Sequence, residues 1–158
     1  MGLDMYLTKE HYIGAEYDHR NVTGSIDIKI GKEPVKIDFN KISTVRERCG
    51  YWRKANHIHK WFVSNVQEGE DDCNEYEVSF EQLKQLLEDC KKVKENKGVA
   101  AETLPTQSGF FFGGNDYDEY YFSVIDDTIK IVEDLLKDTI PSEHGGYLPY
   151  DIIYRSSW

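Results

Sequence analysis

The sequence predicts a single-domain α+β protein, in which a mostly antiparallel sheet of about five to six strands carries about three helices. Three observations indicate this class. The first 50 residues contain apolar residues with a period of two, helical periods follow later, and strands and helices do not alternate as in a doubly wound parallel sheet. The length of 158 residues is usual for one domain, and 1–158 contains neither a linker nor an internal repeat.

The N-terminal part is predicted to be mostly β-structure. Residues 2–7 are a candidate first strand, and residues 10–23, which have no clear period, are interpreted as a loop. Isoleucine alternates with polar residues over 26–30, and apolar residues alternate again over 35–39 after the turn-forming segment 31–34. This pattern is typical of a β-hairpin with one buried and one solvated face.

A helix is predicted to begin at Gly50 and to end near Gly69, whereas residues 42–49 fit a strand or a helix equally well. Apolar residues recur here at spacings of four, three, four and four, as on one side of a helix. They are Tyr51, Ala55, Ile58, Phe62 and Val66. An acidic loop over 68–72 and a short strand over 76–78 are expected to follow.

A second helix is predicted to begin after Ser79. The segment Ser79-Phe80-Glu81-Gln82 has the form of a capping box, in which the serine hydroxyl and the glutamine side chain each pair with a free backbone N–H. Apolar residues then keep helical spacing as far as Val93. Residues 97–108, which combine Gly, Pro, Thr and Ser, are predicted to form a mobile loop.

An aromatic hairpin is predicted next, with strands over 109–113 and 117–122 and a turn over 113–116. On such a strand Tyr117 and Tyr120 point to opposite faces. One interpretation is an aromatic binding surface that includes these two tyrosines. The other is a sheet face covered by a helix, with the tyrosine hydroxyls reaching its edge.

The C-terminal part completes the predicted fold with one helix and one strand. Asp126 or Asp127 can cap the third helix. A loop rich in Gly and Pro is expected over 141–149, and a last strand over 152–154.

The composition excludes several classes of protein. Asp and Glu number 29 against 19 Lys and Arg, and the resulting charge of −10 disfavours nonspecific binding to nucleic acid. No apolar run approaches the ~18 residues of a membrane span, and the first residues do not resemble a secretion signal. Cys49, Cys73 and Cys90 fit neither a disulfide framework nor a zinc motif, so we expect a protein of the cytoplasm without a membrane partner.

The densest group of chemically active side chains lies within the predicted helix that starts at Gly50. Two ridges flank its apolar side. The cationic ridge contains Arg53, His57 and Lys60. The other ridge contains Trp52, Asn56 and His59. An arginine with Lys and His one turn away can bind a phosphate or a carboxylate. The alternative is a solvated basic face that pairs with the protein's own carboxylates.

His57 and His59 are also candidate metal ligands. On a helix, residues two apart point roughly 200° apart and cannot share an ion, whereas on a strand they could. Asp71, Asp72 and Cys73 supply ligand types without a diagnostic spacing. We therefore predict no metal and no cofactor, and we assign no catalytic residue, because phosphate-cradling loops and hydrolase signatures are absent.

Five segments spread over most of the chain form a specific pattern. They are Met1-Gly2-Leu3-Asp4-Met5-Tyr6-Leu7, Tyr51-Trp52-Arg53-Lys54-Ala55-Asn56-x-Ile58-His59-x-Trp61-Phe62-Val63, Asp71-Asp72-Cys73, Gly109-Phe110-Phe111-Phe112-Gly113 and Ser156-Ser157-Trp158. Together they resemble a family of small, uncharacterised proteins of bacteriophages and prophages. The resemblance implies a phage-related genomic setting, but no activity and no catalytic residue.

Two function hypotheses follow from this setting. The leading one is a non-enzymatic, phage-type accessory protein that binds and inhibits a host defence or nucleic-acid-processing component, because an acidic, aromatic-rich domain can occupy a basic groove meant for nucleic acid. The alternative is a small-ligand protein, either a nucleotide-binding sponge or a small hydrolase. Its pocket would lie between the 51–63 helix and the 109–122 hairpin, where aromatic rings hold a base and Arg holds phosphate.

Overall fold

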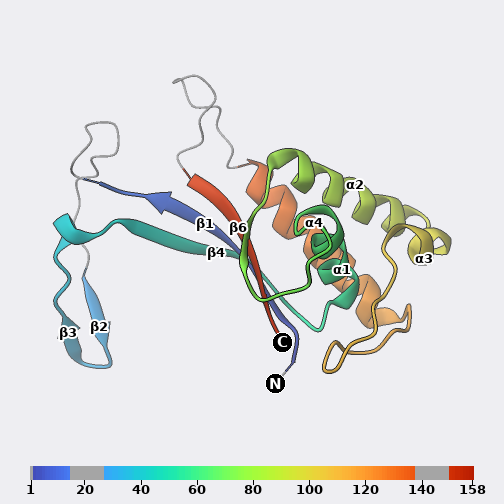
Figure 1. The fold of residues 1–158 in the computed structure, drawn as a ribbon, viewed down its shortest axis with the longest axis horizontal. Helices are drawn as coiled ribbons and strands as arrows, with labels where there is room; N and C mark the ends of the chain where they lie inside the picture. Colours follow the sequence, from blue (N-terminus) through green and yellow to red (C-terminus); the bar gives the residue numbers. More distant parts are fainter. Residues whose placement is uncertain (1, 15–26, 138–149) are drawn as a thin grey trace.

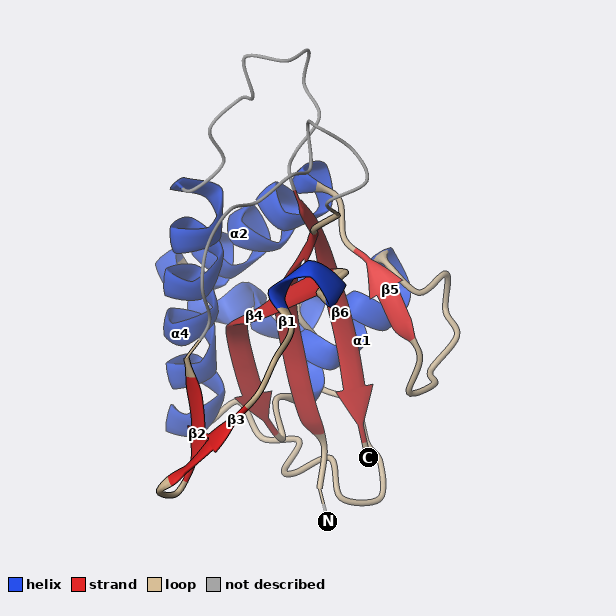
Figure 2. Cartoon of the chain, turned by 90° about the vertical axis from the view of Figure 1, so that its left-hand side faces the viewer, coloured by secondary structure: helices blue, strands red, loops and turns tan. Residues whose placement is uncertain are grey.

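The computed structural model describes residues 2–14, 27–137 and 150–158. Its centre is an antiparallel sheet of four strands in the order β4-β1-β6-β5, of which Figure 1 labels β4, β1 and β6 and Figure 2 labels all four. These strands are β1 (Asp4–Tyr12), β4 (Thr44–Arg53), β5 (Glu75–Glu77) and β6 (Tyr150–Ser157). The predicted α+β class with a mostly antiparallel sheet is confirmed.

Three long helices lie on one side of this sheet (Figures 1 and 2). They are α1 (Asn56–Asn65), α2 (Phe80–Glu95) and α4 (Glu119–Lys137). Within the described ranges, shorter helices lie in the connections, namely η2 (Phe39–Lys41), η3 (Lys97–Val99) and α3 (Ala100–Thr103). Within the described residues, no helix is both long enough and apolar enough to cross a membrane.

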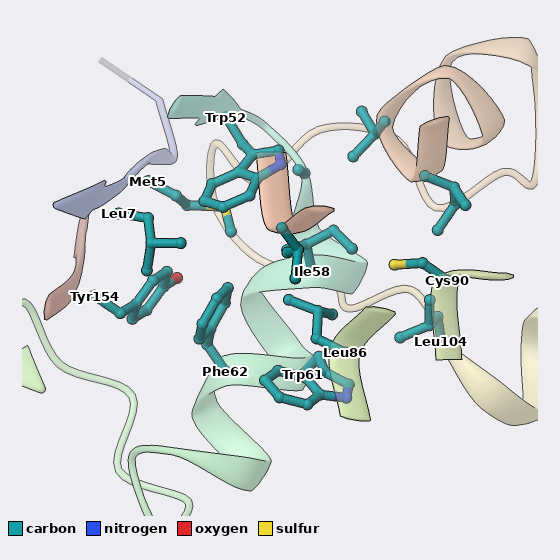
Figure 3. Close-up of a cluster of buried hydrophobic side chains, with 14 of the residues drawn as sticks. Met5, Leu7, Trp52, Ile58, Trp61, Phe62, Leu86, Cys90, Leu104 and Tyr154 are labelled. Atoms are coloured by element: carbon teal, nitrogen blue, oxygen red, sulfur yellow. The ribbon is translucent and has the colours of Figure 1, made fainter. Parts of the chain in front are cut away.

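The hydrophobic core fills the space between the sheet and the helices. Along β1, Met5 and Leu7 are fully buried, whereas Tyr6 and Thr8 on the opposite face are partly exposed. Figure 3 shows how the sheet side chains meet α1, where the rings of Tyr154 and Phe62 stack with their centroids 3.9 Å apart. The alternation along the strands therefore buries one face of the sheet and leaves the other accessible.

A hairpin is present as β2 (Ile28–Ile30) and β3 (Glu33–Val35), with Gly31 at a φ of 64° in the turn between them. The predicted second strand over 35–39 is wrong, because β3 ends at Val35 and Phe39 begins a 3-10 helix. The expectation that one of its faces is buried is wrong, because Ile28 is 39% and Ile30 74% exposed. The hairpin pairs only with itself and forms a separate two-stranded sheet, so it does not share the burial of the main sheet.

The first strand is longer than predicted. It runs past Leu7 to Tyr12, because its backbone pairs with β4 on one side and β6 on the other over nearly its whole length. The predicted loop over 10–23 is therefore partly strand, and its remainder from residue 15 onward lies outside the described residues. The loop predicted over 141–149 also lies outside them.

The prediction that a helix begins at Gly50 is wrong by about two turns. Tyr51 lies opposite Tyr6 and Arg53 opposite Asp4 in the β4–β1 pairing, so this segment is strand. Lys54, at a φ of 55°, ends the strand, and α1 begins two residues later. Pairing with β1 decides this boundary, since the apolar spacing near residue 51 fits both a helix and a strand.

The predicted aromatic hairpin over 109–122 is also wrong. Asp118 caps α4 by accepting a hydrogen bond from the Tyr121 N–H at 3.0 Å, so the tyrosine-rich segment is the first turn of this helix. Residues 109–113 form a turn in which the Phe112 N–H donates to the Gly109 carbonyl. The segment predicted as a mobile loop over 97–108 contains η3 and α3.

Candidate functional site

The structure disperses the residues of the two predicted ridges. Trp52 is a core residue, 4% exposed, whose indole N–H donates to the Thr128 hydroxyl at 2.9 Å. Arg53 lies on the exposed end of β4, with its guanidinium 3.9 Å from the Asp4 carboxylate. Lys60 is half-buried on α1. Trp52 is therefore buried in the core, whereas Arg53 and Lys60 belong to different elements, β4 and α1.

His57 is buried, with 3% of its surface exposed, and its ring packs against Tyr121 with the centroids 4.1 Å apart. Its Nε2 has no hydrogen-bond partner. Burial lowers the pKa of His57 to about 3, so the ring is neutral at pH 7. The expected cationic ridge of Arg53, His57 and Lys60 is wrong, because Arg53 belongs to a strand and His57 carries no charge.

Asn56 acts as a clamp on the segment that follows α3. Its side-chain amide donates to the carbonyls of Phe112 at 3.3 Å and Gly114 at 2.8 Å, and its side-chain carbonyl accepts from the Gln107 N–H at 3.1 Å. A buried side chain with all of these partners fixes a connection that has little regular structure of its own. We therefore assign Asn56 a structural role.

His59 is fully buried in a different network. Its Nδ1 lies 2.8 Å from the Tyr154 hydroxyl, and its Nε2 lies 2.9 Å from the Asp71 carboxylate. Burial lowers the pKa of His59, although Asp71 opposes this effect. His57 and His59 thus have separate surroundings, and in the described part of the chain no three His, Cys, Asp or Glu side chains are grouped to hold a metal ion.

A small hollow does lie where the small-ligand hypothesis places its pocket, between the start of α1 and the segment before α4. Asn56, His57 and Tyr120 line it, but its volume is about 40 Å³. This space suits about three water molecules and is too small for a nucleotide. The Tyr120 hydroxyl donates to the Arg53 carbonyl. Tyr117 packs against Tyr121 but is not part of the lining of the hollow.

A larger concavity of about 360 Å³ lies on the accessible face of the main sheet. This is the face turned away from the helices in Figure 2. It draws its lining from all four strands. We call it the arginine concavity, and its lining consists of Tyr6, Thr8, Arg46, Arg48, Glu75, Ile153, Arg155 and Ser157. Three arginines against one glutamate give it a local positive charge within a chain of net charge −10.

Arg46 is engaged by carboxylates. Its guanidinium donates to both oxygens of Glu75, at 2.6 and 2.9 Å, and its Nε pairs with Glu10. The hydrogen bonds from Arg46, together with the nearby charge of Arg155, lower the pKa of Glu75. This bidentate arrangement fixes the Arg46 side chain at one end of the concavity.

Arg48 and Arg155 are the two arginines that remain available. Within the described residues, neither makes a hydrogen bond or an ion pair. The Arg48 guanidinium lies 5.2 Å from the centroid of the Tyr6 ring, and Arg155 lies opposite Tyr6 in the β1–β6 pairing. Arg48 on β4 and Arg155 on β6 therefore flank Tyr6 on β1, and Arg155 also has Glu75 opposite it in the β5–β6 pairing.

Sequence reasoning missed this site, although part of its signal was visible. Arg46 and Arg48 are two residues apart, as required for one face of a strand, but residues 42–49 were compatible with a helix. Arg155 and Tyr6 come from the two ends of the chain, and only the strand pairing brings them together. Comparison of the chain with protein-family models, curated proteins and solved structures finds no match.

Proposed function

We propose that this chain is a non-catalytic, phage-type binding protein of the bacterial cytoplasm, which captures an anionic ligand in the arginine concavity. The observation that carries this proposal is the pair Arg48 and Arg155 on the open face of the sheet, whose guanidinium groups make no hydrogen bond or ion pair within the described residues. Arginine is the side chain best suited to phosphate and carboxylate groups, because its fork donates two parallel hydrogen bonds.

The lining of the concavity favours binding over catalysis. Among the described residues, its lining contains no His, Cys or Lys and one carboxylate, Glu75, which is held by Arg46. A hydrolase needs a general base or an activated nucleophile near the ligand. The volume of about 360 Å³ lies within the range of small-ligand sites. These features favour the small-ligand hypothesis. Of its two versions, they favour a protein that binds and sequesters its ligand over a hydrolase.

The test measures binding of inorganic pyrophosphate by isothermal titration calorimetry. We expect the wild-type protein to bind it, and the double variant Arg48→Gln/Arg155→Gln to bind at least tenfold more weakly, because hydrogen bonds to charged groups contribute about 1.5–3 kcal/mol each. The matched control is Lys84→Gln/Lys92→Gln, which removes the same charge from exposed positions of α2. Equal loss in both variants, or no binding by the wild type, would contradict the proposal.

A second candidate function, binding to a host macromolecule, is favoured by a separate observation. Phe110 is 84%, Phe111 44% and Trp158 50% exposed, and the rings of Phe110 and Phe111 are 4.5 Å apart. Exposed aromatic side chains of this kind are enriched at the centres of protein interfaces. This surface supports the leading sequence hypothesis, inhibition of a host defence or nucleic-acid-processing component.

Plaque counting tests this candidate. Phage plating is compared on hosts that carry a defence system and express either the wild type or Phe110→Ser/Phe111→Ser. Restored plating with the wild type alone would support a role for the aromatic surface. Unchanged plating across many defence systems would argue against it, whatever the calorimetry shows.

A further inference from the structure

The arginine concavity has features that a site for simple anions does not need. An aromatic residue, Tyr6 on β1, lies between the strands that carry Arg48 and Arg155. Its neighbour across the β1–β4 pairing is Tyr51, and the two ring centroids are 5.4 Å apart. Open sheet faces with aromatic rings bind unstacked nucleic-acid bases, because every base presents a π-face.

The spacing of the two arginines indicates how the anionic part of a ligand would lie. Arg48 is opposite Thr8 and Arg155 is opposite Tyr6, on strands either side of β1. Two strand spacings and two residues along the strand separate their Cα atoms by about 12 Å. Each side chain can reach several ångströms inward, so the pair can grip two adjacent phosphate groups from opposite sides.

Polar and apolar groups beside the arginines match the remaining parts of a nucleotide. The hydroxyl of Ser157 lies on the same face, and the Thr8 hydroxyl, which donates to the Ile153 carbonyl at 3.4 Å, keeps lone pairs to accept a sugar hydroxyl. The Ile153 side chain supplies an apolar contact in the lining. Hydroxyls beside an apolar side chain and a ring suit a ribose and a base better than a bare anion.

The charge of the whole molecule limits the size of the ligand. A long nucleic acid would meet the field of a chain with a net charge of −10, which opposes polyelectrolyte binding. A short ligand meets mainly the local charge of the concavity, where Arg48 and Arg155 are positive in addition to Arg46, which Glu75 and Glu10 engage. The balance therefore favours a single nucleotide over a nucleic-acid strand.

Building on the function proposed above, we propose that the arginine concavity binds a nucleoside diphosphate or triphosphate, with the base on Tyr6 and adjacent phosphates between Arg48 and Arg155. In this arrangement Arg48 leaves the face of the Tyr6 ring and turns to the phosphates, while the base takes its place on the ring. The exchange replaces one cation–π contact by a base stack and a charged hydrogen bond.

The experiment compares ADP, GDP, CDP and UDP with inorganic pyrophosphate and with the corresponding monophosphates by calorimetry. We expect at least one diphosphate to bind about tenfold more tightly than pyrophosphate, because stacking of a base on an aromatic ring contributes about 1–3 kcal/mol. We expect it also to bind about tenfold more tightly than its monophosphate, since one phosphate cannot engage both arginines.

Two variants separate the roles of ring and charge. Tyr6→Leu removes the ring but keeps an apolar side chain, and it should bring the diphosphate down to the affinity of pyrophosphate. Tyr6→Phe keeps the ring and should retain the preference. Far-ultraviolet circular dichroism checks that both variants fold.

The possible failures can be told apart. If pyrophosphate binds as tightly as every diphosphate, the nucleotide proposal is overturned while anion binding stands. If neither pyrophosphate nor any nucleotide binds, both proposals fail. If an oligonucleotide of eight deoxythymidines binds more tightly than every diphosphate, the ligand is a nucleic-acid strand and the nucleotide proposal is again overturned.

Discussion

The hydroxyl of Tyr154 lies 2.8 Å from Nδ1 of His59, and both side chains are fully buried. The other ring nitrogen, Nε2, lies 2.9 Å from the Asp71 carboxylate. Since a carboxylate only accepts, Nε2 carries the proton and donates to it, and Nδ1 accepts from the tyrosine. Burial raises the pKa of Tyr154 and lowers that of His59, so both groups keep this neutral arrangement at pH 7.

Removing the Tyr154 hydroxyl tests this network. The substitution Tyr154→Phe keeps the stack on Phe62, but it leaves Nδ1 of His59 buried without a donor. A buried polar atom that loses its partner costs about 1–3 kcal/mol, so we expect the free energy of unfolding to fall by that amount. Urea denaturation followed by circular dichroism measures it.

The control for this substitution is Tyr117→Phe. The Tyr117 side chain is 39% exposed, and solvent can replace the contacts of its hydroxyl. Its effect should stay within about 0.5 kcal/mol. Equal losses for the two variants would mean that the buried hydrogen bond contributes nothing specific.

Gly50 of β4 lies directly against the Ile131 side chain of α4. A Cβ atom at this position would lie 2.9 Å from Cγ2 of Ile131 and 3.3 Å from Cβ of Leu7. We expect Gly50→Ala to lower the free energy of unfolding by about 1–3 kcal/mol, as overpacking does in other cores. Thermal unfolding of Gly50→Ala measures this effect. Gly114→Ala is the control, because a Cβ at Gly114 meets nothing within 4 Å and should cause no overpacking.

Most of the fold could be predicted because its signals are local. The capping box at Ser79 and the strand near Tyr154 depend on neighbours in the sequence, and both are present. The boundary between β4 and α1 could not be placed in this way. Tyr51 fits the apolar side of a helix, but pairing with Tyr6, far away in the chain, makes it part of a strand. The start of α4 was also misplaced, because Asp118 caps this helix in place of the expected Asp126 or Asp127.

The candidate site was harder to predict than the fold. The sequence drew attention to His57 and His59 because they are chemically versatile, but the fold buries both. The arginine concavity depends on alternation within β4 and on the order of the strands, which places Arg48 and Arg155 on either side of β1. No pattern within one segment contains that information.

The capping box at the start of α2 offers a direct test of local stability. The Ser79 hydroxyl accepts from the Gln82 N–H at 3.2 Å, and the Gln82 side chain accepts from the Ser79 N–H at 2.8 Å. We expect Ser79→Ala to lower the free energy of unfolding by about 1 kcal/mol. Ser123→Ala, at an exposed position inside α4, is the matched control and should be neutral or slightly stabilising, because alanine is the better helix former.

The low pKa of His57 predicts a dependence of stability on pH. Burial lowers this pKa to about 3 in the folded state, from about 6.5 in the unfolded chain. Between these values the unfolded chain binds a proton that the folded protein does not, so stability is complete above pH 6.5 and falls as the pH decreases. The loss approaches about 1.4 kcal/mol for each pH unit below 6.5.

The variant His57→Phe isolates this contribution. Phenylalanine keeps the packing on Tyr121, removes the titrating group and removes the unpartnered Nε2. Measured by urea denaturation between pH 7 and pH 5, the difference in stability between variant and wild type should grow in favour of the variant as the pH falls. Burial also lowers the pKa of His59, and this effect is present in both proteins. The variant therefore keeps part of the pH dependence of stability. Parallel stability curves for the two proteins would show that His57 takes up its proton without unfolding.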